Sequence, residues 1–223
     1  MRRAIPLVVF GLALIILAVV PTAYYLEYGQ VYAVFEDTTV FGKVSRLAGL
    51  ISDLGITVWV AAAAVVLHGF HRLLRSGRRL IGRDYQFYLF AVLLLSLLAV
   101  DDRLMIHEWI DQRSHWPFVV EWHVLAIYGA AAVIGAWRFW RYVRGPSQGW
   151  LWLAFALLWV SYIVDRGPVG HPLVQLLGTM PVDFLEDGSK FLGVCALFLH
   201  LFNLMVDPPC AEIINRRERT NAR

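Results

Sequence analysis

Charged side chains are scarce in this chain of 223 residues, because Asp, Glu, Lys and Arg together make up only 17% of it. A soluble domain carries about 25% of these residues. Hydrophobic residues account for 59% of the chain, and they gather in blocks long enough to cross a bilayer, which takes about 20 helical residues. The composition therefore argues against an ordinary soluble domain and predicts an integral membrane protein, with the lipid bilayer as its main partner.

Cysteine is also scarce, and the common catalytic sequence motifs are absent. The two cysteines, Cys195 in an apolar block and Cys210 near the C-terminus, give no disulfide framework. The sequence has no Gly-x-Ser-x-Gly, P-loop or dinucleotide-binding motif, and neither His-Glu-x-x-His nor Glu-x-x-His. No soluble domain or low-complexity linker interrupts the apolar blocks. The sequence thus predicts a membrane domain without a recognisable reaction signature.

Hydropathy predicts six membrane-spanning helices and therefore an all-α bundle. We treat residues 1–223 as one transmembrane domain. The first apolar block follows Met1-Arg2-Arg3 like a signal peptide, but it is longer than the about 7–15 residues of such a segment, and we expect it to be retained. The spans are expected at residues 5–26, 54–74, 85–110, 117–140, 150–164 and 182–206, followed by a cytoplasmic tail at 207–223.

Two further segments, residues 36–52 and 166–181, are too short or too polar to cross a bilayer. The first could form an amphipathic helix that lies on the outer surface. The second has Pro and Gly at both ends of a short apolar run, which indicates a segment that dips into the membrane or lies flat. Both are expected on the outer side.

Arginine determines the predicted orientation of the spans. If the N-terminus, the 71–84 and 138–149 loops and the C-terminal tail share one side, that side holds fourteen of the 20 basic residues and four of the 17 acidic ones. This asymmetry predicts both termini on the cytoplasmic side of a bacterial inner membrane. The net charge of +3 is then a topology signal, and it does not indicate nucleic-acid binding.

The stretch from Val100 to Trp109 ends span three with three carboxylates, an arginine and a histidine. Such side chains are costly at membrane depth and usually face a bundle interior or a wet cavity. The mostly apolar part of this span before Asp101 is about 21 Å long, whereas the hydrocarbon core is about 30 Å thick. We therefore expect Asp101 and Asp102 within the outer third of the bilayer.

Spans three and four are expected to bring metal-ligating side chains to a common depth. In a continuous helix Asp101 and Glu108 share one face, and Arg103 and His107 share another. Carboxylates and imidazoles on several helices suit a divalent metal such as zinc, manganese or iron, which would activate a water molecule. Span four returns at a comparable depth with two further candidates. The predicted metal ligands are Asp101, His107, Glu108, Glu121 and His123.

Span six opens with the run Glu186-Asp187-Gly188-Ser189-Lys190. Glu186 and Lys190 are one helical turn apart with the acid first, which is the favourable order, and acids suit a helix N-terminus. The structural interpretation is a self-neutralised helix start. The functional interpretation is an anion site formed by Lys190 and free backbone N–H groups. Both interpretations place this run at the N-terminus of the last span.

Two kinds of function fit these predicted features. The first is a metal-assisted hydrolase or transferase that acts on a lipid or lipid-linked substrate. The second is a non-enzymatic transporter, proton- or ion-binding unit or complex subunit whose charges form a structural ion network. A pathway across the membrane is disfavoured, because the inner halves of the spans have few polar groups. The predicted catalytic residues are Asp101, Asp102, Glu108 and Lys190, and the other pocket candidates are Arg103, Asp165, Glu186 and Asp187.

A third function follows from two isolated histidines in the inner halves of the spans. His68 near the inner end of span two and His200 in span six could lie at similar depth and coordinate a haem iron from both sides. The protein would then be a b-type cytochrome. A lone histidine on a span is more often a hydrogen-bonded bundle residue, so this hypothesis ranks last.

Two motifs resemble the signatures of an uncharacterised family of small bacterial multi-pass membrane proteins. They are Asp101-Asp102-x-x-x-x-His107-Glu108 and Glu186-Asp187-Gly188-Ser189-Lys190-Phe191-Leu192-Gly193. The resemblance covers spans three to six and extends to span two through Asp53-Leu54-Gly55-Ile56. It implies a site at the outer ends of these spans, and it implies no activity.

Overall fold

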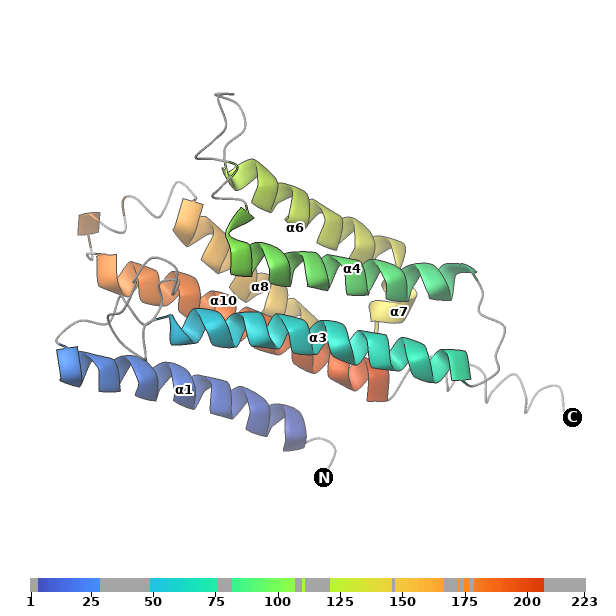
Figure 1. Ribbon diagram of the computed structural model, residues 1–223, viewed down its shortest axis with the longest axis horizontal. Helices are drawn as coiled ribbons and strands as arrows, with labels where there is room; N and C mark the ends of the chain where they lie inside the picture. The colour runs from blue at the N-terminus through green and yellow to red at the C-terminus, as the bar shows by residue number, and fades with distance from the viewer. Residues whose placement is uncertain are drawn as a thin grey trace, which may run out of the picture. The chain divides into compact units, whose positions relative to one another are not determined.

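The computed structural model of the protein is all-helical over the residues that it describes, with no strand among them. It describes residues 4–28, 49–75, 82–106, 110, 121–145, 147–166, 172, 175–176 and 179–206. Most of the predicted outer segments at 36–52 and 166–181 and the whole tail at 207–223 lie outside these residues. The helices are α1 (Ala4–Tyr28), α3 (Leu50–Arg75), α4 (Gly82–Leu104), α6 (Glu121–Arg138), α7 (Trp140–Val143), α8 (Gln148–Arg166) and α10 (Thr179–Val206) (Figure 1).

Each of the six predicted spans falls on one of these helices. Over the described residues, two stretches are long and apolar enough to cross a membrane, Leu50–Arg72 in α3 and Phe184–Val206 in α10. Shorter apolar helices occupy Leu7–Ala23, His123–Arg138 and Gln148–Val164. Because the core helices of soluble proteins can meet the same criteria, the helical fold is confirmed while a bundle of six membrane spans stays a prediction.

The end of α4 differs from the sequence prediction. Span three was expected to continue to Ile110, but α4 ends at Leu104. The next residue, Met105, has a φ of 49°, in the left-handed region that few non-glycine residues adopt. A right-handed helix cannot continue through this conformation. The helical register that would place Glu108 above Asp101, and His107 beside Arg103, therefore ends before it reaches His107.

The chain forms two compact units, each built from two segments of sequence. The first comprises residues 1–58 and 150–197. The second comprises residues 59–149 and 198–223. The helices α3 and α10 contribute residues to both units, whereas α4, α6 and α7 belong to the second alone.

The core of the first unit consists of apolar side chains from α1, α3 and α10. On α1, Phe10, Ala13, Leu17 and Val20 recur at intervals of three or four residues, which places them on one face of the helix. Phe10 also contacts the ring of Trp150 on α8, with ring centroids 5.1 Å apart. This face is therefore the packed side of α1. The fully buried members of the core are Ala13, Leu17, Ile51, Phe191 and Cys195.

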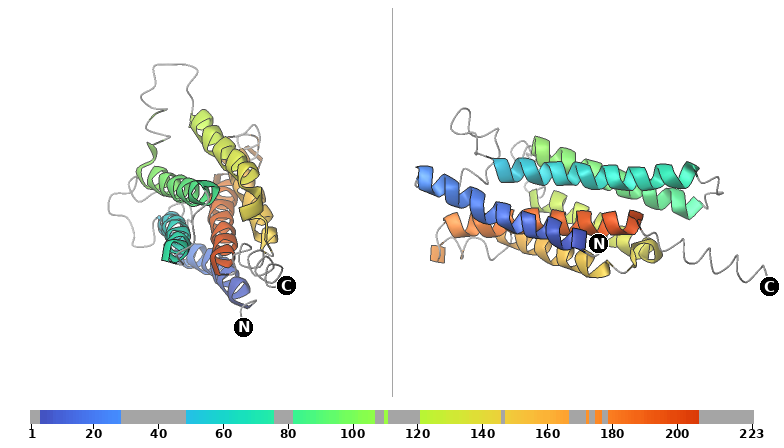
Figure 2. Two further views of the ribbon diagram at one scale, coloured as in Figure 1. Left: turned by 90° about the vertical axis from the view of Figure 1, so that its right-hand side faces the viewer. Right: turned by 90° about the horizontal axis from the view of Figure 1, so that it is seen from below.

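Aromatic side chains hold the second unit together where α3 ends and α4 begins. Phe70 of α3 stacks on Tyr88 of α4 at 5.4 Å between ring centroids. On the same helix, Phe87 stacks on Tyr142 of α7 at 5.1 Å and packs edge-on against Phe139 at 5.7 Å. The described part of α3 in this unit and α4 lie side by side in Figure 1 and in the right-hand view of Figure 2. These rings join three helices at one end of the unit.

The helices α4 and α6 run side by side in opposite directions (Figures 1 and 2). Gly135 on α6 leaves room for the ring of Phe90 on α4, because a Cβ at that position would overlap the ring unless the ring moved. Small residues at contact points are typical of helix packing in membranes, where they let two backbones approach. The α4–α6 pair is the part of the fold that positions the candidate site.

Two polar side chains within the apolar helices bond to the backbone of their own helix. Thr22 donates to the carbonyl of Ala18 at 2.7 Å, and Asn203 donates to that of Leu199 at 2.7 Å. One donor of each side chain is thereby satisfied without a second helix, which lowers the cost of placing it in an apolar environment.

Replacing Gly193 with alanine is expected to destabilise the first unit. The added Cβ would lie 2.9 Å from Cγ and 3.2 Å from the backbone nitrogen of Leu158 on α8. We expect a loss of about 1–3 kcal/mol, as for other overpacked positions. The matched control is Gly129→Ala on α6, where a Cβ meets nothing within 4 Å and the helix should gain about 0.5–1 kcal/mol. Thermal unfolding in detergent measures the stability of both variants. Equal melting temperatures for Gly193→Ala and Gly129→Ala would contradict close packing of α8 on α10.

Candidate functional site

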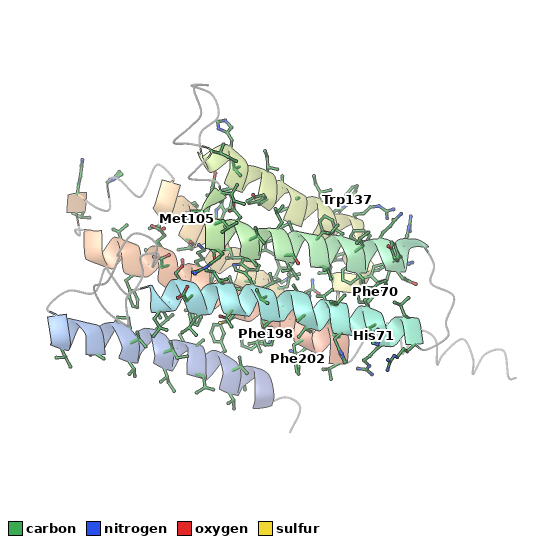
Figure 3. All side chains as sticks on the ribbon, in the orientation of Figure 1. Phe70, His71, Met105, Trp137, Phe198 and Phe202 are labelled. Carbon is green, nitrogen blue, oxygen red and sulfur yellow. The ribbon has the colours of Figure 1, made fainter. Side chains whose placement is uncertain are left out.

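Asp101 is the only acidic side chain that is buried among the described residues, with 3% of its surface exposed. It lies in the last turn of α4, and the phenol of Tyr128 on α6 donates a hydrogen bond of 3.3 Å to its Oδ1. Asp101 makes a further interaction as well. Since an unpaired buried charge is costly, the phenol is part of what makes this position tenable. The pair joins α4 to α6 at the end of the second unit marked by Met105 in Figure 3.

Sequence analysis predicted Asp101 as a site residue but missed Tyr128 as its partner. Residue types alone do not indicate this pair, because a tyrosine in an apolar stretch resembles any other aromatic residue until the register of the two helices is known.

The neighbours of Asp101 on α4 have different environments. Asp102 is half-buried and Arg103 is exposed, and each has an interaction partner. His123 near the start of α6 is half-buried and also has a partner. The left-handed conformation of Met105 costs about 1–2 kcal/mol at a non-glycine residue. Strained residues of this kind are frequent at functional sites, so the conformation of Met105 supports a functional hypothesis for this end of α4.

Several predicted site residues are not placed by the structure. His107 and Glu108 lie outside the described residues. Glu121 begins α6 and Asp165 lies near the end of α8, but their side chains are likewise outside what is described. The proposed metal set is therefore described only at Asp101 and His123. Among the described residues, no three His, Cys, Asp or Glu side chains are grouped to hold a metal ion.

The run from Glu186 to Lys190 does not lie at a helix start. It was predicted to open span six, but α10 begins at Thr179 and has no acid in its first turn. Pro181 does not stop the helix, because the N–H groups of a first turn have no intrahelical partner. The hypothesis of an anion site on free N–H groups beside Lys190 is therefore wrong. The hydroxyl of Ser189 donates to the carbonyl of Glu186 at 2.9 Å.

Glu186, Asp187 and Lys190 are half-buried, and each has an interaction partner. They belong to the first unit, whereas Asp101, Asp102, Arg103 and His123 belong to the second. The structure thus brings the α4 and α6 residues into one unit.

A buried imidazole occupies a different part of the second unit. His200 on α10 is 1% exposed, and its Nδ1 lies 3.0 Å from Oγ and 3.2 Å from the carbonyl oxygen of Ser147. Its Nε2 is a buried atom with no hydrogen-bond partner in the part of the chain that is described. His68, in contrast, is exposed on α3. This difference in environment gives no support to the prediction of a haem held between the two histidines.

A second carboxylate–phenol pair lies at the opposite end of α4. The phenol of Tyr142 donates to Oδ1 of Asp84, and the guanidinium of Arg141 donates to the phenol oxygen. Nη2 of Arg141 lies 3.9 Å from the same carboxylate oxygen. Burial of Tyr142 and its hydrogen bond to Asp84 raise the pKa of the phenol above its usual value. Sequence analysis did not predict this cluster.

The pKa of Tyr142 predicts how its contribution to stability depends on pH. Because the folded state raises this pKa, the contribution is complete below the unfolded value of about 10 and is lost as the pH rises through the higher folded value. We expect Tyr142→Phe to unfold more easily than the native protein at pH 7. The difference should begin to shrink above about pH 10, where the phenol of the unfolded state ionises, and should go on shrinking until the native phenol ionises at its higher pKa. Denaturant unfolding of both proteins from pH 7 to pH 11 measures the difference in their free energies of unfolding. A difference that stays constant over this range would contradict the prediction.

Comparison with known proteins adds a family but no activity. A family model described as a domain of unknown function (DUF8692) matches residues 6–204. The match includes the α4–α6 pair, and it reaches from α1 almost to the end of α10. No match is found among curated proteins or among solved structures.

Proposed function

The chain belongs to this family of unknown function, and on that premise we propose that it is a multi-pass protein of the bacterial inner membrane. The proposal has six spans with both termini in the cytoplasm. It is supported by two helices of sufficient length and apolarity and by three shorter apolar helices. The clustering of arginine on the proposed inner loops agrees with it.

The outward faces of several helices also support a lipid environment. Large apolar side chains are 68% exposed at Leu7 on α1, 60% exposed at Leu93 on α4 and 65% exposed at Ile127 on α6. Extensive apolar surface of this kind marks a membrane or protein contact. In a bilayer, it would need no protein partner to cover it.

The proposed topology predicts the side from which single cysteines react. In a background without Cys195 and Cys210, Arg78→Cys should react with a membrane-impermeant maleimide only in inside-out vesicles. Ser114→Cys should react in intact spheroplasts, because it lies on the proposed outer side. The cysteine-free background is the control for labelling. Reaction of both variants from the same side would contradict the six-span topology.

At the polar end of α4, we propose the active site of a hydrolase or transferase for a lipid or lipid-linked substrate. The observation that carries the proposal is the burial of Asp101 against Tyr128 in a helix whose other buried residues are apolar. Apolar residues would hold two helices together in lipid at lower cost than a carboxylate. An ionisable residue at membrane depth is therefore a functional candidate by default.

The proposed chemistry assigns distinct roles to the side chains at this end. A divalent ion, when bound, would supply a water nucleophile at neutral pH. Tyr128 is a positioning residue that fixes the Asp101 carboxylate through its hydrogen bond. Asp102 is the candidate general base, because it is a second carboxylate next to the first. The side chains proposed to hold the ion are Asp101, His107, Glu108, Glu121 and His123.

Replacing Asp101 with asparagine tests the proposed role. The side chain keeps its size and an oxygen that can accept from Tyr128, so we expect the protein to fold. Native protein purified in detergent should contain stoichiometric zinc, manganese or iron by elemental analysis, and Asp101→Asn should lose it. The control is Tyr128→Phe, which keeps the carboxylate and should retain the metal while losing about 1 kcal/mol of stability. Native protein without metal would overturn the metal-assisted reaction, and a Soret band in its absorption spectrum would indicate haem instead.

A structural ion network is the second candidate function, and one observation favours it. Asp101, Asp102 and Arg103 each have an interaction partner, as do Glu186, Asp187 and Lys190 in the other unit. If these contacts serve only stability, Asp101→Asn should lower the melting temperature while native protein contains no metal. The same two measurements therefore separate the two candidates.

A further inference from the structure

The corner between α6 and α7 presents two arginines over buried aromatic rings. The guanidinium carbon of Arg138 lies 5.6 Å from the ring centroid of Phe139, and that of Arg141 lies 4.7 Å from the ring centroid of Tyr142. The two ring centroids are 6.4 Å apart. Two cations are thus placed over neighbouring rings.

The rings beneath these cations are fixed by their packing. Phe139 and Tyr142 are 7% and 6% exposed, and both contact Phe87 on α4. The backbone is also set here, because Phe139 leaves the helical conformation with φ −110° and ψ 22° and the chain turns into α7. Cations over such rings lose less freedom on binding a ligand than cations on free side chains do.

The charges at this corner favour an anionic ligand. Arg138 is exposed, and 58% of the Arg141 side chain is exposed although one of its nitrogens donates to Tyr142. A guanidinium has five N–H donors in a planar fork that matches phosphate oxygens. Asp84, the nearby acid, accepts from Tyr142, and its Oδ1 lies 3.9 Å from Nη2 of Arg141, so it offsets part of one of the two positive charges. Among the described residues, the other exposed arginines at this end of the second unit are Arg72, Arg75, Arg83 and Arg144.

An exposed tryptophan identifies the environment in which that ligand would be met. Trp137, next to Arg138, is 79% exposed, and it lies toward the same end of the unit as Phe70 and His71 (Figure 3). Tryptophan is enriched at the membrane–water interface, where its ring sits at headgroup level. Arginines at that level meet lipid phosphates before they meet soluble anions.

We propose that Arg138 and Arg141 form a binding site for the phosphate of an anionic phospholipid. The inference uses the proposed membrane location and is independent of the proposed chemistry at Asp101. It differs from general attraction of basic loops to lipid, because it assigns the binding to two cations held over buried rings rather than to the total charge.

The test compares two variants with the same loss of charge. Full-length protein in detergent is titrated with phosphatidylglycerol or with zwitterionic phosphatidylcholine, and bound lipid is counted by native mass spectrometry. We expect the native protein to prefer phosphatidylglycerol. Arg138→Gln/Arg141→Gln should lose at least about tenfold more phosphatidylglycerol affinity than Arg72→Gln/Arg75→Gln, because charge-assisted bonds from positioned guanidinium groups are the stronger ones.

Two further measurements keep the result interpretable. Arg138→Gln alone leaves the contacts of Arg141 with Asp84 and Tyr142 in place, so its loss of affinity cannot be attributed to misfolding of that cluster. Inorganic phosphate is added as a competitor to separate a lipid site from a site for a soluble anion. Equal losses in the two double variants, no preference for phosphatidylglycerol, or displacement of the lipid by millimolar phosphate would each overturn the proposal. A native preference for phosphatidylglycerol together with no metal in the purified protein would retain this site and reject the metal-assisted reaction.

Discussion

The structure depends on how polar groups are satisfied within helices that are largely apolar. Thr22 and Asn203 bond to carbonyls of their own helices. Asp101 cannot do so, because a carboxylate has no donor, and it takes a hydrogen bond from Tyr128 on the next helix. The cost of an unpaired buried carboxylate exceeds that of an unpaired neutral group. Interhelical contacts are therefore most specific where the acids lie, and elsewhere close packing at glycines such as Gly135 and Gly193 suffices.

Much of the helical arrangement could be predicted from sequence, because hydropathy reports the apolar length of each helix directly. Asp101 and Asp102 were both singled out by their place at the end of an apolar run, but which of the two is buried could not be predicted from that place. The end of α4 could not be predicted from sequence, since Met105 adopts a left-handed conformation that its side chain does not favour. The start of α10 was missed because Pro181 was interpreted as a boundary, although the first turn of a helix accepts proline.

The partners of the charged residues were the least predictable part. Tyr128 and Tyr142 are recognised only when the register between helices is known, because a phenol in an apolar stretch resembles any other aromatic residue. Arg138 and Arg141, the two arginines that lie over aromatic rings, pose the same difficulty. In sequence they count as two of many positive charges on an inner loop. In the structure each lies over a ring that is itself buried.

The two carboxylate–phenol pairs on α4 have a mechanical consequence. Asp84 accepts from Tyr142 near the first turn of the helix, and Asp101 accepts from Tyr128 near its last. The two acids are about 25 Å apart along the axis, at 1.5 Å per residue. A helix fastened at both ends can neither slide along its axis nor rotate about it without breaking both bonds together. A displacement of α4 along or about its axis relative to the α6–α7 segment would thus break both bonds together, whereas a tilt away from one end would break only the bond at that end.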